Sequence, residues 1–138
     1  MPYDPMLVQP MREDMTSMNA EELMDAAAVD AFMAREGTKL VFVNSVCGCA
    51  AGQARPALRL ALQHGTTPDH VGTVFAGQDV DATAKARGYF QDIPPSSPSV
   101  VLFKAGRPVF YLPRHMIEGR DPPSVAFELV TAFDEFCS

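Results

Sequence analysis

The sequence predicts an α/β protein with a mixed central sheet and helices on both of its faces. Apolar runs of strand length alternate along the chain with segments whose apolar residues recur at helical spacing. Two of these runs are separated only by Ala105-Gly106, as in a β-hairpin. The chain has 138 residues, 47% of them hydrophobic, which is enough for one domain core, so we expect a single domain over residues 1–138.

Residues 1–18 are expected to form an N-terminal extension packed on the body of the domain. Several prolines, the last of them Pro10, argue against a long uninterrupted helix, so we expect a short helix only after Pro10. Residues 20–24 fit either the start of a helix capped by Asn19 or a short edge strand.

The first regular helix and the first central strand follow. Asp25 is a good N-cap for a helix over residues 26–36, which a glycine then stops. Residues 39–46 are a continuous run of branched and aromatic side chains, typical of a strand that is buried on both faces. A helix begins at or near Cys49, and Pro56 inside it should bend it or remove one backbone hydrogen bond.

The second half of the chain predicts a strand, a short helix, the hairpin and a final amphipathic helix. Their expected ranges are 71–77, 79–90, 99–104 with 107–112, and 121–137. A βαβ unit followed by a ββα unit, with helices on both sheet faces, is the thioredoxin-like architecture. We therefore predict a thioredoxin-like fold with a mixed sheet of about four to five strands.

The most specific motif is Cys47-Gly48-Cys49, between a buried strand and the start of a helix. Unpaired N–H groups and the positive end of the helix dipole stabilise a thiolate there. A second thiol two residues away can attack a mixed disulfide formed on the first and release the bound thiol. We expect Gly48 to permit the tight backbone geometry of a disulfide between its neighbours. The motif therefore predicts redox chemistry, with Cys47 and Cys49 as the catalytic residues.

Polar residues on both sides of the motif are candidates for binding a small thiol. Asn44 and Ser45 end the preceding strand, and Gln53 lies in the following helix. Arg55 could place a positive charge near the thiolate, but we expect it to be an ordinary solvated residue of the helix surface.

The loop before the strand at 99–104 supplies another candidate contact. In a thioredoxin-like fold, a cis proline at this position lies beside the cysteines and exposes the preceding backbone to the substrate chain. We assign this place to Ser97-Pro98, because the strand begins immediately afterwards. Pro94 and Pro95 are the rival candidates.

Composition excludes several classes of protein. The chain carries 11 Lys+Arg against 17 Asp+Glu, and this net charge of −6 disfavours nucleic-acid binding and polybasic attachment to membranes. No apolar stretch approaches the ~18 residues that cross a bilayer, and the N-terminus does not resemble a secretory signal. We expect a cytoplasmic protein. Three cysteines, an odd number, cannot form a closed disulfide framework.

Two other functions remain open at this point. The motif and Cys137 could bind a metal ion or cluster, including across a dimer, although the sequence lacks a second cysteine pair and the His spacing of a zinc site, so we assign no metal ligand. The protein could also be a non-catalytic binding module whose cysteines report redox state. Cys137 itself fits either an apolar residue that closes the last turn or a third reactive thiol.

Several long segments resemble the bacilliredoxins, thioredoxin-like proteins of bacteria that use bacillithiol. They include EGTKLVFVNS, VNSVCGCAAGQARPA, VFAGQDVDATAKARGYF, PPSSPSVVLFKAGRPVFYLPRHMIEGRDP and the terminal FDEFC. The resemblance extends over essentially the whole chain and favours a short strand at residues 20–24. It implies removal of bacillithiol from S-thiolated cytoplasmic proteins, with Cys47 attacking and Cys49 resolving, and also disulfide isomerase activity. The low-molecular-weight thiol is then a substrate, and no cofactor is expected.

Overall fold

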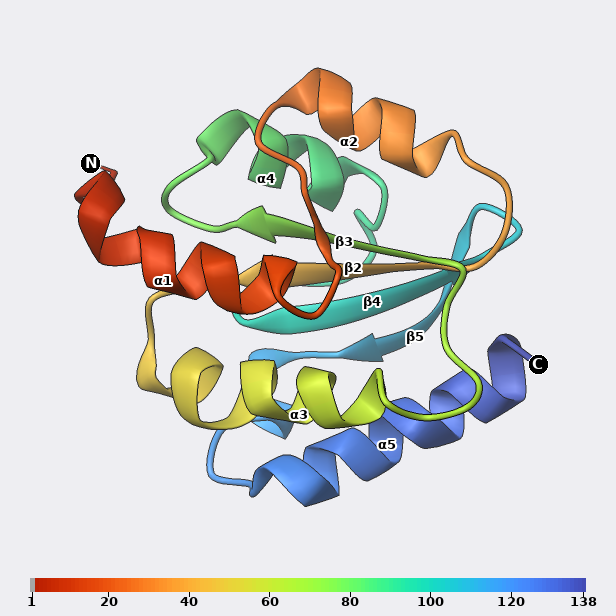
Figure 1. Cartoon of the computed structure of the whole chain (residues 1–138). Helices are drawn as coiled ribbons and strands as arrows, with labels where there is room; N and C mark the ends of the chain where they lie inside the picture. Colours follow the sequence, from red (N-terminus) through yellow and green to blue (C-terminus); the bar gives the residue numbers. More distant parts are fainter. Residues whose placement is uncertain (1) are drawn as a thin grey trace.

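Figure 1 shows the computed structural model, which describes residues 2–138; Met1, part of the predicted extension, lies outside the described residues. Over these residues the chain forms a five-stranded sheet with the order β1-β3-β2-β4-β5. β1 and β2 run parallel to β3, whereas β4 is antiparallel to both β2 and β5. The strands are β1 (Glu21–Glu22), β2 (Lys39–Asn44), β3 (His70–Phe75), β4 (Ser99–Lys104) and β5 (Arg107–Leu112). The predicted mixed sheet is confirmed.

Helices cover both faces of the sheet. Figure 1 shows α2 and α4 on one face and α3 and α5 on the other. The helical elements are α1 (Pro5–Thr16), α2 (Ala26–Met33), the π-helical turn η1 (Ala50–Ala54), α3 (Arg55–Ala61), α4 (Val80–Gly88), the 3₁₀ turn η2 (Arg114–Met116) and α5 (Pro122–Phe136).

The central strand β2 divides the hydrophobic core into two layers. Every residue of β2 is buried, as predicted for a strand covered on both faces. Leu40 and Phe42 pack into the layer of α3 and α5, and Val41 and Val43 pack into the layer below α2 and α4. This follows from the alternation of side chains along a strand. β2 is therefore a rigid support for the residues that follow its end.

The N-terminal helix differs from the prediction. α1 begins at Pro5 rather than after Pro10, and it contains Pro10 in its interior. Pro5 occupies the first turn, where its missing N–H removes no hydrogen bond, and the Asp4 side chain caps the helix by accepting from the Met6 N–H. The bond that Pro10 removes lies in an exposed part of the helix, while Met15 packs into the core. Tertiary packing thus outweighs the cost of the inner proline.

The other elements follow the predictions closely. Residues 20–24 contain the short edge strand β1, and the Asp25 side chain caps α2 by accepting from the Ala28 N–H at 2.8 Å. Ala105 and Gly106 turn the β4–β5 hairpin with positive φ values of 54° and 76°, as a tight two-residue turn requires. Within residues 2–138, no helix has both the length and the apolar character needed to cross a membrane.

Candidate active site

The cysteine motif lies at the end of β2, on the side of the molecule that is at the left in Figure 1. The carboxyl ends of β2 and β3 meet there with the start of β4 and the end of β5, because the last two strands run antiparallel. The Cys47 carbonyl accepts from the Ala50 N–H at 3.1 Å and the Ala51 N–H at 3.3 Å. The helical segment thus begins at the motif, as predicted.

The two thiols of the motif are adjacent but differ in accessibility. Their Sγ atoms are 2.6 Å apart, and both cysteines are free. Cys47 is partly exposed, whereas Cys49 is only 8% exposed. An incoming disulfide can therefore reach Cys47 first, and Cys49 is close enough to attack whatever becomes bound to it.

The surroundings shift the pKa values of these thiols in opposite directions. Burial by itself raises the pKa of Cys47, but hydrogen bonds from Cys49, from Ser45 and from backbone N–H groups outweigh it, so the pKa is lowered. The Ser45 hydroxyl donates to the Cys47 sulfur at 3.2 Å. Burial raises the pKa of Cys49, and the hydrogen bond to Cys47 and the negative charge of its thiolate raise it further. Of the two thiols, Cys47 is therefore the one whose thiolate is favoured.

An irregular helical turn separates the motif from α3. In η1, the Arg55 N–H donates to the Ala50 carbonyl, a spacing of five residues instead of four. Pro56, which has no N–H, then stands in the first turn of α3. The predicted irregularity of the helix around Pro56 takes the form of this π-helical turn, a feature that often occurs at functional sites.

Arg55 is buried below the motif, so its predicted place on the solvated helix surface is wrong. It is 4% exposed and donates to the Asn44 side chain at 2.8 Å and to the Ser45 carbonyl at 3.0 Å. The Asp14 carboxylate, from α1, lies 3.3 Å from its Nε and balances its charge. Arg55 therefore ties the end of β2 to α1 and to the start of α3.

Asn44 also has a different role from the predicted contact with a small thiol. It is 1% exposed, and its side-chain oxygen accepts from both Arg55 and the Ser45 N–H. Its amide donates to the Met11 carbonyl at 3.3 Å. These bonds occupy the Asn44 side chain, which therefore supports the Ser45–Cys47 loop from below and does not face a substrate.

A groove with a volume of about 340 Å³ lies beside Cys47. Of the predicted site residues, Ser45 and Ser97 line it together with Cys47. The Ser97–Pro98 bond is cis, as expected at this position, and Pro98 is buried below the groove wall. The full lining consists of Tyr3, Ser45, Val46, Cys47, Ala76, Gly77, Arg87, Ser97 and Arg114.

Two other predicted site residues lie outside the groove lining. Gln53 does not line this groove. Gly48 is exposed, its φ is not positive, and a Cβ there would have open space. Its expected role in a disulfide between Cys47 and Cys49 stays a prediction, because both cysteines are free in this structure.

Sequence patterns did not identify Tyr3, Arg87 or Arg114 as groove residues. They come from the N-terminal segment, from α4 and from the end of β5, which are far apart along the chain. Arg114 follows the last residues of β5, and a strand antiparallel to β4 must end beside the start of β4. The predicted hairpin could therefore have indicated that Arg114 lies near the start of β4 and the groove.

The third cysteine lies at the other end of the sheet. Cys137 is the C-cap of α5, and its neighbours Thr38 and Lys104 lie before the start of β2 and at the end of β4. Burial raises its pKa. Within one chain it therefore cannot share a metal ion with Cys47 and Cys49, and residues 2–138 contain no cluster of His, Cys, Asp and Glu that could hold one.

Comparisons with known proteins agree with this geometry. The model of a family described as disulphide isomerase matches residues 3–137. A bacilliredoxin of Shouchella clausii is 52% identical over 136 residues, covering 98% of this chain and 94% of that protein. A bacilliredoxin of Salinibacter ruber is 48% identical over 141 residues, covering 100% of this chain and 82% of that protein.

Solved structures show the same fold at much lower identity. The oxidized mitochondrial thioredoxin 3 of Saccharomyces cerevisiae superposes with a TM-score of 0.56 at 16% identity, covering 89% of this chain and 99% of that one. Trxlp from Edwardsiella tarda superposes with a TM-score of 0.56 at 19% identity, covering 80% of this chain and 98% of that one. The predicted thioredoxin-like fold is confirmed, and the chain belongs to the bacilliredoxin family of thiol–disulfide oxidoreductases.

Proposed function

We propose that the protein releases a low-molecular-weight thiol, bacillithiol, from mixed disulfides with cytoplasmic proteins. The observation that carries the proposal is the pairing of an accessible thiol of lowered pKa, Cys47, with a buried thiol of raised pKa, Cys49, at 2.6 Å. The bacilliredoxin relatives support this choice of thiol.

In the first step, the Cys47 thiolate attacks the sulfur of the small thiol within the mixed disulfide. A new disulfide forms between Cys47 and the small thiol, the old one breaks, and the target protein leaves as a thiolate that takes a proton from water. The Ser45 hydroxyl and the N–H groups at the start of the helix hold the attacking anion until it reacts.

In the second step, Cys49 attacks the sulfur of Cys47. While Cys47 is a thiolate, its negative charge raises the pKa of Cys49. The first step removes that charge, so Cys49 loses its proton more readily only after the small thiol is bound. A disulfide then forms between Cys47 and Cys49, and the small thiol leaves as its thiolate.

Each cycle oxidises the two cysteines by two electrons and reduces one mixed disulfide. The motif returns to the dithiol by exchange with two equivalents of a low-molecular-weight thiol or with a reduced dithiol protein. Both steps use only sulfur chemistry, so the proposal includes no metal ion or organic cofactor.

A trapping experiment tests the assignment of roles. Reduced Cys49→Ala is mixed with a single-cysteine protein carrying bacillithiol, and intact mass and free target thiol are measured. We expect one bacillithiol on Cys47 and one target thiol released per adduct, because the second step is blocked. Cys137→Ala should instead finish the cycle without an adduct, and Cys47→Ala should do neither.

Two outcomes would contradict the proposal. The first is a target protein that keeps its bacillithiol in the presence of wild-type protein. The second is an adduct of Cys49→Ala that peptide mapping places on Cys137 instead of Cys47.

Disulfide isomerase activity is a second proposed function, favoured by the description of the matching family. The same Cys47 thiolate would attack a disulfide between two protein cysteines, and the freed cysteine would attack another disulfide of the same substrate. Recovery of activity from a scrambled, disulfide-bonded enzyme measures this; wild-type protein that does not accelerate recovery above the level of Cys47→Ala would exclude it.

A further inference from the structure

We propose that the groove beside Cys47 binds a carboxylate of the thiolating group between Arg87 and Arg114, so that the protein selects small thiols that are anionic. This inference rests on the proposed function, since it concerns the thiol that becomes bound to Cys47. It is carried by a guanidinium without a carboxylate partner, by the charge of the groove lining, and by the place of both arginines in the same groove as the reacting sulfur.

Arg87 lacks the partners that the other internal arginines have. Its Nε is buried and donates to no acceptor within residues 2–138. Its Nη2 lies 3.5 Å from the Ser96 carbonyl, at the outer limit of a hydrogen bond. A half-buried guanidinium with an unpaired N–H is costly, because its desolvation is not compensated. An anion bound in the groove would supply the countercharge that Arg87 lacks.

The other arginines of the chain differ from Arg87 in their ion pairs. Over residues 2–138, every arginine except Arg87 and the exposed Arg107 lies in an ion pair with a carboxylate. These pairs are Arg12 with Asp79 and Glu22, Arg35 with Glu21, Arg55 and Arg59 with Asp14, Arg114 with Glu118, and Arg120 with Glu128. Over residues 2–138, Arg87 is thus the one half-buried arginine that forms no ion pair with a carboxylate.

Arg114 provides the second positive charge of the groove. Its Nε binds Glu118 at 3.1 Å, and its Nη1 lies 3.4 Å from the Ser97 carbonyl, on the wall of the groove. Its charge acts on the sulfurs of both Cys47 and Cys49. Arg114 and Cys47 line the same groove, so Arg114 can contact a group attached to the Cys47 sulfur.

The groove is cationic in an acidic protein. None of the described residues that line it is acidic, although the chain has a net charge of −6. Its volume of about 340 Å³ is suited to a small molecule. Arginine binds carboxylates with two parallel hydrogen bonds, which makes it more selective for a planar anion than lysine.

The test compares two mixed disulfides on one peptide with neutral flanking residues. One peptide carries mercaptosuccinate, a thiol with carboxylates, and the other carries thioglycerol, which is neutral. The measured quantity is the ratio of their rates of transfer to Cys47. A general change in the reactivity of Cys47 affects both rates equally and cancels in this ratio.

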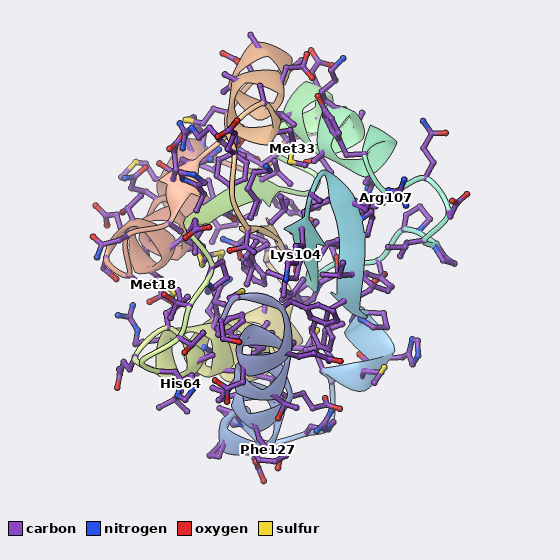
Figure 2. The ribbon with its side chains drawn as sticks, turned by 90° about the vertical axis from the view of Figure 1, so that its right-hand side faces the viewer. Met18, Met33, His64, Lys104, Arg107 and Phe127 are labelled. Atoms are coloured by element: carbon purple, nitrogen blue, oxygen red, sulfur yellow. The ribbon has the colours of Figure 1, made fainter. Side chains whose placement is uncertain are left out.

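We expect wild-type protein to prefer mercaptosuccinate, and Arg87→Gln to lower that preference about tenfold, the loss expected for a charge-assisted hydrogen bond. Arg87→Lys should keep part of it, because the charge remains without the planar fork. Arg107→Gln is the matched control: Arg107 is an exposed arginine at the hairpin end of the sheet, on the side that faces the viewer in Figure 2. Its ratio should equal that of the wild type.

A third peptide separates the thiol from the target protein as the source of the anion. It carries thioglycerol next to two aspartates. If its rate depends on Arg87 and that of mercaptosuccinate does not, the groove binds an acidic target segment and the inference is overturned. It is also overturned if Arg87→Gln leaves the ratio unchanged while melting as the wild type does.

The proposed function fails separately, if wild-type protein accepts none of these mixed disulfides and releases no bacillithiol from a protein. Equal transfer from mercaptosuccinate and thioglycerol, with Cys47 still required, would retain the thiol exchange and reject the anionic preference.

Discussion

A partly exposed cysteine lies near each end of β2, but the two are in opposite chemical environments. Cys47 lies where β2 leads into the start of a helix, and hydrogen bonds from Cys49, Ser45 and backbone N–H groups lower its pKa in spite of burial. Cys137 lies beside the start of β2 as the C-cap of α5, and burial raises its pKa, with a further contribution from Asp69. Figure 2 looks onto this second end, where Lys104 is labelled.

The difference shows that partial burial does not by itself make a cysteine reactive. A helix start presents N–H donors and positive potential to a thiolate, and a helix end presents carbonyl groups and negative potential. The lowered pKa of Cys47 therefore favours the thiolate at one end of the strand, and the raised pKa of Cys137 favours the neutral thiol at the other. Four experiments test this contrast, taken from the largest expected effect to the smallest.

Replacing the cysteines one at a time should separate the two ends most strongly. Cys47→Ala removes the nucleophile, so release of bacillithiol from a protein should fall by about a thousandfold or more, to the rate without enzyme. Cys137→Ala should retain the wild-type rate within about twofold, because Cys137 does not contact the groove. Steady-state release of the small thiol measures both. A comparable loss in Cys137→Ala would show that the two ends act together.

A buried cation lies near each end of β2, Arg55 near Cys47 and Lys39 near Cys137. Removing them should lower the free energy of unfolding by different amounts. Arg55→Met leaves Asn44 and the Ser45 carbonyl without their donor, and should lower the free energy of unfolding by about 2 to 4 kcal/mol. Lys39→Met removes an ammonium that donates to the carbonyls of Arg35 and Gly37.

Arg35 and Gly37 are exposed residues, so water can replace the Lys39 donor and the expected loss is about 1 kcal/mol or less. Urea unfolding of both variants measures the difference. Equal losses of unfolding free energy would mean that the hydrogen bonds of Arg55 do not hold the cysteine motif in place.

Alkylation by iodoacetamide should distinguish the thiols without any substitution. At pH 7 we expect Cys47 to react at least about tenfold faster than Cys137, because a lowered pKa leaves more thiolate. The Cys47 rate should fall when the pH drops below its lowered pKa, whereas the Cys137 rate should rise only as the pH becomes alkaline. Peptide mapping after timed quenching gives both profiles. Parallel profiles would contradict the opposite pKa shifts.

The smallest expected effect comes from single hydroxyl groups. Ser45→Ala removes the donor to the Cys47 sulfur and should raise its pKa, slowing alkylation of Cys47 at pH 6 by about fivefold, the equivalent of one hydrogen bond of about 1 kcal/mol. The difference between the two proteins should shrink at pH 9, where more of the thiol is ionised in both. Thr38→Val is the matched control, since it removes a hydroxyl group beside Cys137 and should leave the Cys47 rate unaffected at both pH values. A pH-independent loss in Ser45→Ala would indicate a displaced loop instead.

Much of this molecule could be predicted from local patterns along the chain. The all-apolar run of β2, the Asp25 cap and the Ala105-Gly106 turn each determine their own conformation, because side-chain alternation, capping and turn geometry involve residues a few positions apart. The position of the cysteines follows from the same local order, since a motif between a strand and a helix lies at the strand end.

Other properties depend on residues that are distant in the sequence. The sequence predicts a solvated Arg55 and an Asn44 that contacts a small thiol, yet the two are buried together because Asp14 and Met11 of α1 bond to them. No local sequence pattern predicts this burial, because α1 contains a proline that argues against the helix itself.

The groove beside Cys47 is the clearest case of a feature that local sequence patterns do not predict. Arg87 comes from α4 and Arg114 from η2, just after β5. They line the same groove beside Cys47 because the mixed sheet brings the ends of β2 and β3 to the same edge as the start of β4. The chemistry of the sulfur is encoded within a few consecutive residues, because helix and strand geometry are short-range. The charge that faces the sulfur depends on long-range strand pairing and on long side chains, and it can be known only from the folded chain.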